Sequence, residues 1–266
     1  MIKDSTFAID IKTFPIMGFL RKITGAVYYC FLSLGSIGYP ETTAYVEVNG
    51  QKLLYAVRGP EGGKPVVLLH GNGGSHKSLL TQAKQLARKG YRVYSPDSRG
   101  QGANPPLDEY HYADMAEDSW AFINAMGLDK PAVYGWSDGG ILVLMIEMAH
   151  PGTIGLGAIS GANLFPDCGP GFEEFKTWIL EQGTPLAMMM LDEPDIDPAD
   201  LKAIGCPVLV TVGDKDLISI EHTHLISDNI PDSELVVIKN ATHSSFIKKN
   251  PRMGRLLLDF LQRHGY

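Results

Sequence analysis

Apolar and polar positions follow two different patterns from about residue 45 to the C-terminus. Short apolar or alternating runs predict strands; these runs are 45–48, 53–57, 66–69, 91–95, 132–134, 154–160, 208–212 and 235–238. Apolar residues three and four positions apart predict helices over 78–88, 112–126, 141–150 and 246–263. Asn49-Gly50 separates the first two runs and is a two-residue hairpin signal. Strands that alternate with helices predict an α/β fold, with a mostly parallel sheet, helices on both faces and the hairpin as an antiparallel edge.

This alternation is interrupted between about residues 162 and 204. The stretch is rich in Pro, Gly, Asp and Met, and 172–180 is a helix candidate within it. We interpret 162–204 as a small lid insertion over the carboxyl edge of the sheet, where ligands bind in open α/β folds. The core of the domain then consists of 41–161 and 205–266.

Residues 1–40 differ in composition from the rest of the chain. The run 23–39 is uncharged and follows Arg21 and Lys22, but it contains Gly and Ser and falls short of the ~20 residues that span a bilayer. We expect 1–40 to be an N-terminal extension, either an amphipathic or apolar arm packed on the core or a plain helix. Alternatives remain open: contact with a membrane surface through 14–39, a homodimer contact, or a signal or anchor for export.

Composition and charge narrow the function classes. The chain has 266 residues, 44% of them hydrophobic, and a net charge of −7, which is typical of a globular protein and unfavourable for nucleic acid. The three cysteines, Cys30, Cys168 and Cys206, form no C-x-x-C pair, so we expect a reducing, cytoplasmic compartment. The acids of 192–197 have no His among them and are interpreted as a solvated turn, and no metal or cofactor is expected.

A candidate nucleophile lies between a predicted strand and a predicted helix. Gly135-Trp136-Ser137-Asp138-Gly139 matches G-x-S-x-G in that context. A turn this sharp places the serine in a strained conformation and needs small neighbours. The start of the following helix offers N–H groups and the positive end of its dipole to a developing oxyanion.

A serine hydroxyl needs a base, and the base needs an orienting acid. Of the eight His, His243 follows the last predicted strand, so a parallel sheet carries it to the same edge as Ser137. His222 and His224 fall on a predicted helix after Gly213 and are expected to be solvated. The loop Gly213-Asp214-Lys215-Asp216 supplies two acids. We favour Asp216, which lies deeper in the loop, whereas Asp214 could cap the turn.

Five motifs together resemble the α/β-hydrolase superfamily, and specifically its serine esterase and lipase-like members. They are His70-Gly71-Asn72-Gly73-Gly74, Asp97-Ser98-Arg99-Gly100-Gln101-Gly102, Gly135-Trp136-Ser137-Asp138-Gly139-Gly140, Gly213-Asp214-Lys215-Asp216 and His243. The resemblance covers about 45–266 and implies a catalytic triad in the chain order Ser137, Asp216, His243.

The same resemblance implies further roles. The backbone N–H groups of Asn72 and Asp138 would form the oxyanion hole, while Asp97 and Arg99 would be structural. Many relatives carry a bulky apolar residue where Asn72 stands, so the pocket wall is expected to be more polar here. A serine nucleophile excludes the dehalogenase and epoxide-opening relatives, which use Asp.

The expected activity is hydrolysis of a carboxylic ester with a small or medium acyl group. Residues expected to bind this substrate are Trp136, Phe165, Trp178 and Met189. The alternatives on the same triad are lysophospholipid or monoglyceride hydrolysis, thioester hydrolysis, aminopeptidase activity and carbon–carbon bond hydrolysis. A ligand receptor with residual turnover is an alternative of another class.

Overall fold

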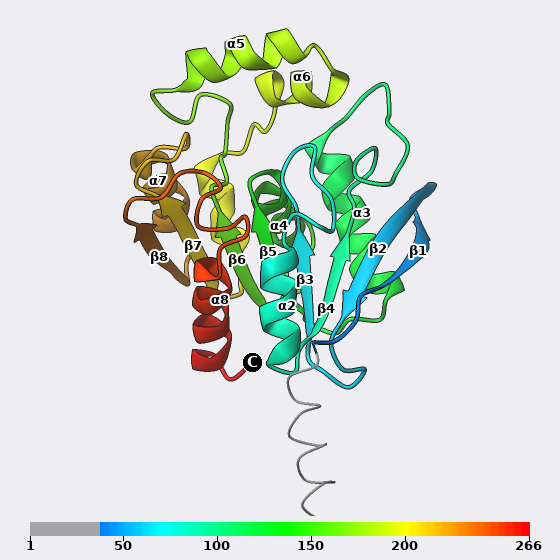
Figure 1. Ribbon diagram of the computed structural model, residues 1–266. Coiled ribbons are helices and arrows are strands. Elements are labelled where there is room, and N and C mark those ends of the chain that lie inside the picture. Colours follow the sequence, from blue (N-terminus) through cyan, green and yellow to red (C-terminus); the bar gives the residue numbers. More distant parts are fainter. Residues whose placement is uncertain (1–37) are drawn as a thin grey trace, which may run out of the picture. The chain divides into compact units, whose positions relative to one another are not determined.

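A computed structural model describes residues 38–266, and Figure 1 shows their arrangement. The expectations for 1–37, which include most of the N-terminal extension, its membrane or dimer contact and Cys30, lie outside the described residues. Tyr39–Tyr266 forms a single compact unit. Among the helices of this unit, none combines the length and the apolar character needed to cross a membrane.

Eight strands form one sheet in the order β1-β2-β4-β3-β5-β6-β7-β8. The strands are β1 (Thr42–Val48), β2 (Gln51–Arg58), β3 (Pro65–Leu69), β4 (Arg92–Pro96), β5 (Ala132–Trp136), β6 (Leu156–Ser160), β7 (Val208–Gly213) and β8 (Ser233–Ile238). β1 and β2 pair antiparallel across Asn49-Gly50, where both residues have positive φ, and β2 is antiparallel to β4. The strand pairs from β4 to β8 are parallel. The predicted α/β fold with an antiparallel edge is confirmed.

Helices cover both faces of the sheet (Figure 1). α2 (Leu80–Arg88) and α8 (Arg252–Arg263) share one apolar core with one face. α3 (Tyr112–Ala125), α4 (Asp138–Ala149) and α7 (Ile220–Asn229) share a second core with the other face. α4 is apolar nearly all round because it is buried between the sheet and α3, whereas α8 has a single apolar stripe that faces the sheet.

The segment between β6 and β7 contains more helix than the sequence pattern suggested. α5 (Phe172–Gln182) was expected in part, but α6 (Pro185–Asp192) and the 3-10 helix η1 (Pro198–Ala203) were not. α6 has a local signal for its start: the Thr184 hydroxyl accepts the N–H of Ala187, and Pro185 occupies the first helical position. Figure 1 shows α5 and α6 beyond the carboxyl ends of the parallel strands.

The last helix is shorter than predicted. The apolar pattern suggested a helix over 246–263, but residues 243–249 form turns and α8 begins at Arg252. Pro251 explains the difference, because a residue before proline disfavours the helical conformation and proline itself has no N–H to donate. The side chains of Phe246 and Ile247 are nevertheless buried, which produced the misleading pattern.

Candidate active site

Ser137 occupies a sharp turn between β5 and α4. Its backbone φ is 57° and ψ is −123°, a conformation that is costly for a residue with a side chain. Glycines make the turn possible: a Cβ at Gly135 would lie 1.9 Å from the Gly139 oxygen, and a Cβ at Gly139 would lie 2.1 Å from the Leu69 oxygen. The N–H of Ser137 donates to the carbonyl of Ser160 on β6 at 2.8 Å. The turn is therefore held between two strands, and the hydroxyl points into a cavity.

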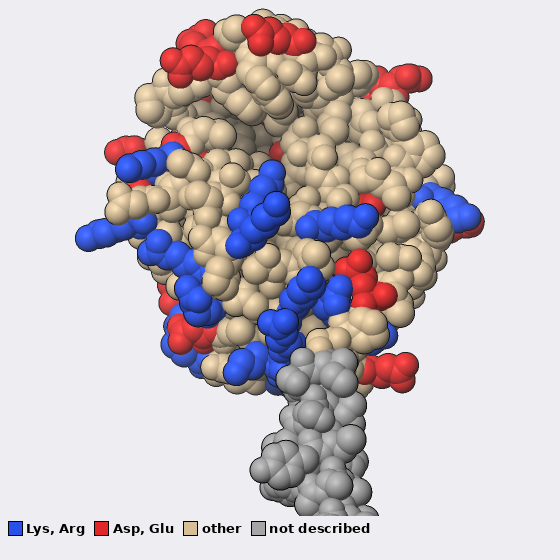
Figure 2. Space-filling model, viewed as in Figure 1, with Lys and Arg blue, Asp and Glu red and all other residues tan. Residues whose placement is uncertain are grey.

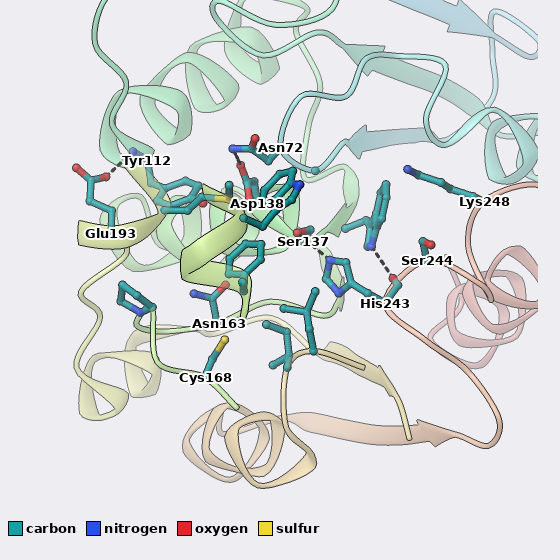
Figure 3. A pocket seen from close by; sticks show the side chains of 18 residues that line it. Asn72, Tyr112, Ser137, Asp138, Asn163, Cys168, Glu193, His243, Ser244 and Lys248 are labelled. Carbon is teal, nitrogen blue, oxygen red and sulfur yellow. Dashed lines mark hydrogen bonds between the residues drawn. The ribbon is translucent and has the colours of Figure 1, made fainter. Parts of the chain in front are cut away.

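The imidazole of His243 lies next to this hydroxyl. Its Nε2 is 3.0 Å from Ser137 Oγ, and its Nδ1 is 2.7 Å from Asp216 Oδ1 (Figure 3). Residues 243, 216 and 137 follow β8, β7 and β5, so the parallel sheet delivers all three to one edge. Gly161 leaves room for the ring, because a Cβ there would lie 2.8 Å from its Cε1.

The two acids after β7 have different surroundings. The Asp216 carboxylate is fully buried, and its Oδ1 also accepts the N–H of Ile218 at 3.2 Å. The Asp214 carboxylate faces the loop after β8, where Oδ1 accepts the N–H of Ala241 at 3.1 Å. Backbone N–H donors from Asn240 and Ala241 lower the pKa of Asp214. The structure thus places Asp216 against His243 and Asp214 at the turn.

The loop after β3 passes close to the serine. A Cβ at Gly71 would lie 2.9 Å from the Cβ of Ser137, so only glycine permits this approach. Asn72 follows it, and its side-chain Nδ2 donates to Asp138 Oδ2 at 2.9 Å. Asp138 is the first residue of α4, where N–H groups have no acceptor within the helix. Asn72 and Asp138 line the same cavity as Ser137, and the role of their N–H groups as oxyanion donors stays a prediction.

Comparison with known proteins agrees with this geometry. A family model for the alpha/beta hydrolase fold matches residues 64–187. The chain is 28% identical to the serine hydrolase BPHL of Homo sapiens, over 85% of this chain and 89% of that protein. It is 25% identical to a thermostable monoacylglycerol lipase of Bacillus sp., over 83% of this chain and 98% of that protein.

A solved esterase from Exiguobacterium antarcticum has the same fold, with a TM-score of 0.73, 20% identity and coverage of 83% of this chain and 100% of that one. The chain has the α/β-hydrolase fold. The two relatives named here are a serine hydrolase and a lipase, and their similarity over most of both chains, together with the contacts of His243, supports a hydrolase.

The hydrolase has a cavity of about 250 Å³ that contains Ser137 and His243 (Figure 3). Trp136 and Trp178 line it, as the sequence suggested. Further lining residues that the sequence analysis did not single out for binding include Tyr112, Asn163, Cys168, Phe175, Met190, Glu193 and Lys248. The α5–α6 segment supplies part of this wall.

Two substrate-binding expectations are wrong in position. Phe165 packs edge-on against the imidazole of His222 at a centroid distance of 4.6 Å and is not among the described residues that line the cavity. Met189 is a residue of α6 whose side chain is buried in the core. Its neighbour Met190 lines the cavity instead. Adjacent residues on a helix point about 100° apart. In a run of three methionines, the sequence therefore does not show which side chain points into the cavity.

His222 and Glu193 also differ from expectation. His222 is buried rather than solvated: its Nε2 accepts the N–H of Leu164 at 2.9 Å, and burial lowers its pKa to about 4. Glu193, expected in a solvated turn, lies at the cavity and accepts the N–H of Tyr112 at 2.8 Å. His224, by contrast, is exposed on α7.

The carboxyl group of Asp138 lies in the cavity wall beside the serine. Burial raises the pKa of this group to about 6, while hydrogen bonds from Asn72 and Tyr112 oppose that shift. The pKa of Tyr112 is raised well above its usual value by its own burial and by Asp138. The sequence motif assigned Asp138 a role only through its backbone N–H, because nothing in the motif indicates where its side chain points.

Among residues 38–266 the structure brings no three His, Cys, Asp or Glu side chains together in an arrangement that holds a metal ion. Asp97 serves the fold instead. Its carboxylate accepts the N–H of Ala103 at 2.9 Å and contacts the His76 ring at 2.8 Å. Arg99 donates to Asp118 and Asp114, in each case at 2.7 Å, and so ties the loop after β4 to α3. These contacts agree with the structural role that the resemblance implies.

Proposed function

We propose that the chain hydrolyses carboxylic esters of small or medium acyl groups through an acyl-enzyme at Ser137. The observation that carries the proposal is the pair of contacts of one imidazole: 3.0 Å to the Ser137 hydroxyl and 2.7 Å to the Asp216 carboxylate. With Nδ1–H donated to Asp216, Nε2 has a free lone pair and can accept the hydroxyl proton.

In the first half-reaction, Ser137 Oγ forms a bond to the ester carbonyl carbon while His243 Nε2 takes its proton. The carbonyl oxygen becomes an oxyanion that the N–H groups of Asn72 and Asp138 bind. The tetrahedral intermediate collapses, the ester C–O bond breaks, and Nε2 protonates the leaving alcohol. In the second half-reaction, Nε2 removes a proton from water, which attacks the acyl-enzyme and releases the carboxylic acid and Ser137.

The cavity favours short substrates. A volume of about 250 Å³ is at or below the small end of ligand pockets. Phe175 and Trp178 of α5 stack at 5.7 Å beside it and, with Met190, form an apolar wall. This wall supports the role of 162–204 as a lid, and the volume favours short acyl esters over long-chain lipids.

Active-site labelling tests the proposal. A fluorophosphonate probe is expected to react with Ser137 alone, since a hydroxyl activated by an imidazole is far more nucleophilic than other serines. Peptide mapping identifies the modified residue. A series of p-nitrophenyl esters from acetate to decanoate is expected to show kcat/KM highest at the short end. Labelling at a different serine, or no turnover of any ester, would argue against the proposal.

A second candidate is hydrolysis of an ester or amide bond next to an amino group, as in aminopeptidases. The observation that favours it is the Asp138 carboxyl, which is 4% exposed and lines the cavity beside the nucleophile. Its hydrogen-bonding partners, Asn72 and Tyr112, are neutral. A buried carboxylate without a cation is costly, and a substrate ammonium group would compensate it.

The pH dependence of substrate preference tests this candidate. The Asp138 carboxyl is neutral below its pKa of about 6 and negative above it, so attraction to a cation is present at higher pH and lost as pH falls. We compare an ester whose acyl chain ends in trimethylammonium with its neutral tert-butyl isostere. The ratio of their kcat/KM values is expected to rise about tenfold between about pH 5 and about pH 8.

Taking the ratio removes the pH dependence that both esters share through the triad. In Asp138→Asn the ratio is expected to be low at every pH, while Asp228→Asn, which removes an exposed acid of α7, should behave like the parent. A rise of equal size in Asp138→Asn would eliminate this candidate.

A further inference from the structure

Positive charge is concentrated on one face of an acidic protein. Residues 38–266 contain 19 Lys and Arg against 28 Asp and Glu, yet ten of those cations and only one acid, Asp259, lie in the segments 77–89 and 239–263. These segments include α2, α8 and the loops that precede them, and we call their exposed surface the basic face. Figure 2 shows the blue side chains gathered there, below a hollow under the α5–α6 segment.

One member of the basic face reaches the cavity. Lys248 lines it, and its Nζ lies 4.8 Å from the centroid of the Trp136 indole ring. The indole is itself fixed, because its Nε1 donates to the carbonyl of His243 at 3.0 Å. The loop that carries Lys248 is anchored to α2 by Gln82, whose buried side chain donates to the Ile247 carbonyl at 2.9 Å. The ammonium group is thus held at the cavity by packing and by a cation–π contact.

The position of Lys248 relative to the reacting groups indicates which part of a substrate it meets. His243 Nε2 must protonate the leaving atom, so the leaving group lies on the His243 side of Ser137. Figure 3 shows Lys248 and Ser244 on that side, and Glu193 and Tyr112 on the other. The indole centroid is 5.7 Å from the imidazole centroid, and Nζ is 4.8 Å from the indole centroid, so Nζ lies at most about 10.5 Å from the imidazole centroid.

We propose that Lys248 recognises a leaving group that carries a negative charge, so that the preferred substrates are esters of hydroxy acids or of similar anionic alcohols. This assignment rests on the proposed ester hydrolysis and adds the chemical class of the alcohol. The rest of the basic face contributes by attracting such anions toward the cavity, as a surface of one charge sign does for an oppositely charged ligand.

Matched esters test the assignment. The acetate esters of 3-hydroxybenzoate and 3-hydroxybenzamide differ in the charge of one group of nearly equal size, and the 4-substituted pair repeats the comparison at another position. In the parent protein kcat/KM is expected to be about fivefold higher for the carboxylate than for the amide at low salt. The preference should decrease at about 0.5 M salt, because added ions screen an exposed lysine.

Variants assign the preference to one side chain. Lys248→Met keeps an unbranched stem against Trp136 but removes the charge, and the preference is expected to disappear. Lys248→Arg should retain it, and Lys248→Glu should favour the amide. Lys202→Met in η1 makes the same charge change outside the basic face and is expected to leave the ratio unchanged.

The outcomes separate this inference from the function on which it rests. If the parent hydrolyses none of the four esters, the proposed ester hydrolysis fails. If it hydrolyses them without preferring the carboxylates, or keeps its preference in Lys248→Met, ester hydrolysis stands and the assignment of Lys248 is overturned.

Discussion

Replacement of Ser137 by alanine is expected to reduce kcat for p-nitrophenyl acetate by about 10⁶-fold, to a residual rate supplied by the oxyanion donors and substrate binding. The substitution removes one oxygen and leaves the imidazole, the buried acid and the backbone donors in place. Alanine must adopt the same positive φ as serine, so the strain of the turn is unchanged and the free energy of unfolding should stay within about 0.5 kcal/mol of the parent.

The measurement is steady-state hydrolysis together with thermal unfolding of both proteins. Labelling by a fluorophosphonate should be lost in parallel with turnover. Hydrolysis at the parental rate by a folded Ser137→Ala variant would remove Ser137 from the mechanism, and with it the acyl-enzyme.

The Asp216→Asn substitution is expected to lower kcat by about 10⁴-fold. The amide would donate a proton to His243 Nδ1 where the carboxylate accepts one, so the ring would carry its proton on Nε2. In that tautomer, Nε2 cannot take the proton of Ser137. The side chain keeps its shape, and the loss should therefore appear in kcat more than in folding.

Asp214→Asn is the matched control, because it makes the same change two residues away in the same loop. An asparagine oxygen can still accept the Ala241 N–H, so kcat is expected to change less than about threefold. Equal losses in the two variants, or a larger loss at Asp214, would contradict the assignment of the acid to Asp216.

Sequence patterns correctly predicted those structural elements that depend only on short runs of neighbouring residues. The hairpin at Asn49-Gly50, the parallel strands and the turn at Ser137 each depend on residues that are neighbours in the chain. The predicted helices were wrong where proline or a mixed composition worked against the spacing of apolar residues. Pro251 stops the apolar pattern of 246–263 from being one helix, and α6 was not recognised within a stretch rich in Pro and Met.

Side-chain directions depend on packing between distant segments. Met189 and Met190 are both buried in the core that contains α6, but Met190 alone of the two lines the cavity. His222 is buried because the backbone of Leu164, far away in sequence, donates to its ring. Neither choice is encoded in the residues next to it along the chain.

By itself the sequence determined the order of strands and helices outside 162–204, the serine turn and the candidates for its base and acid, since these follow from local conformational preferences and from the common direction of parallel strands. Tertiary structure decided between Asp214 and Asp216, placed the Asp138 carboxyl in the cavity and carried Lys248 to the His243 side of it. Those outcomes depend on how close distant segments come to one another once the sheet, α2 and α8 have packed. The residues next to each position along the chain do not determine these distances.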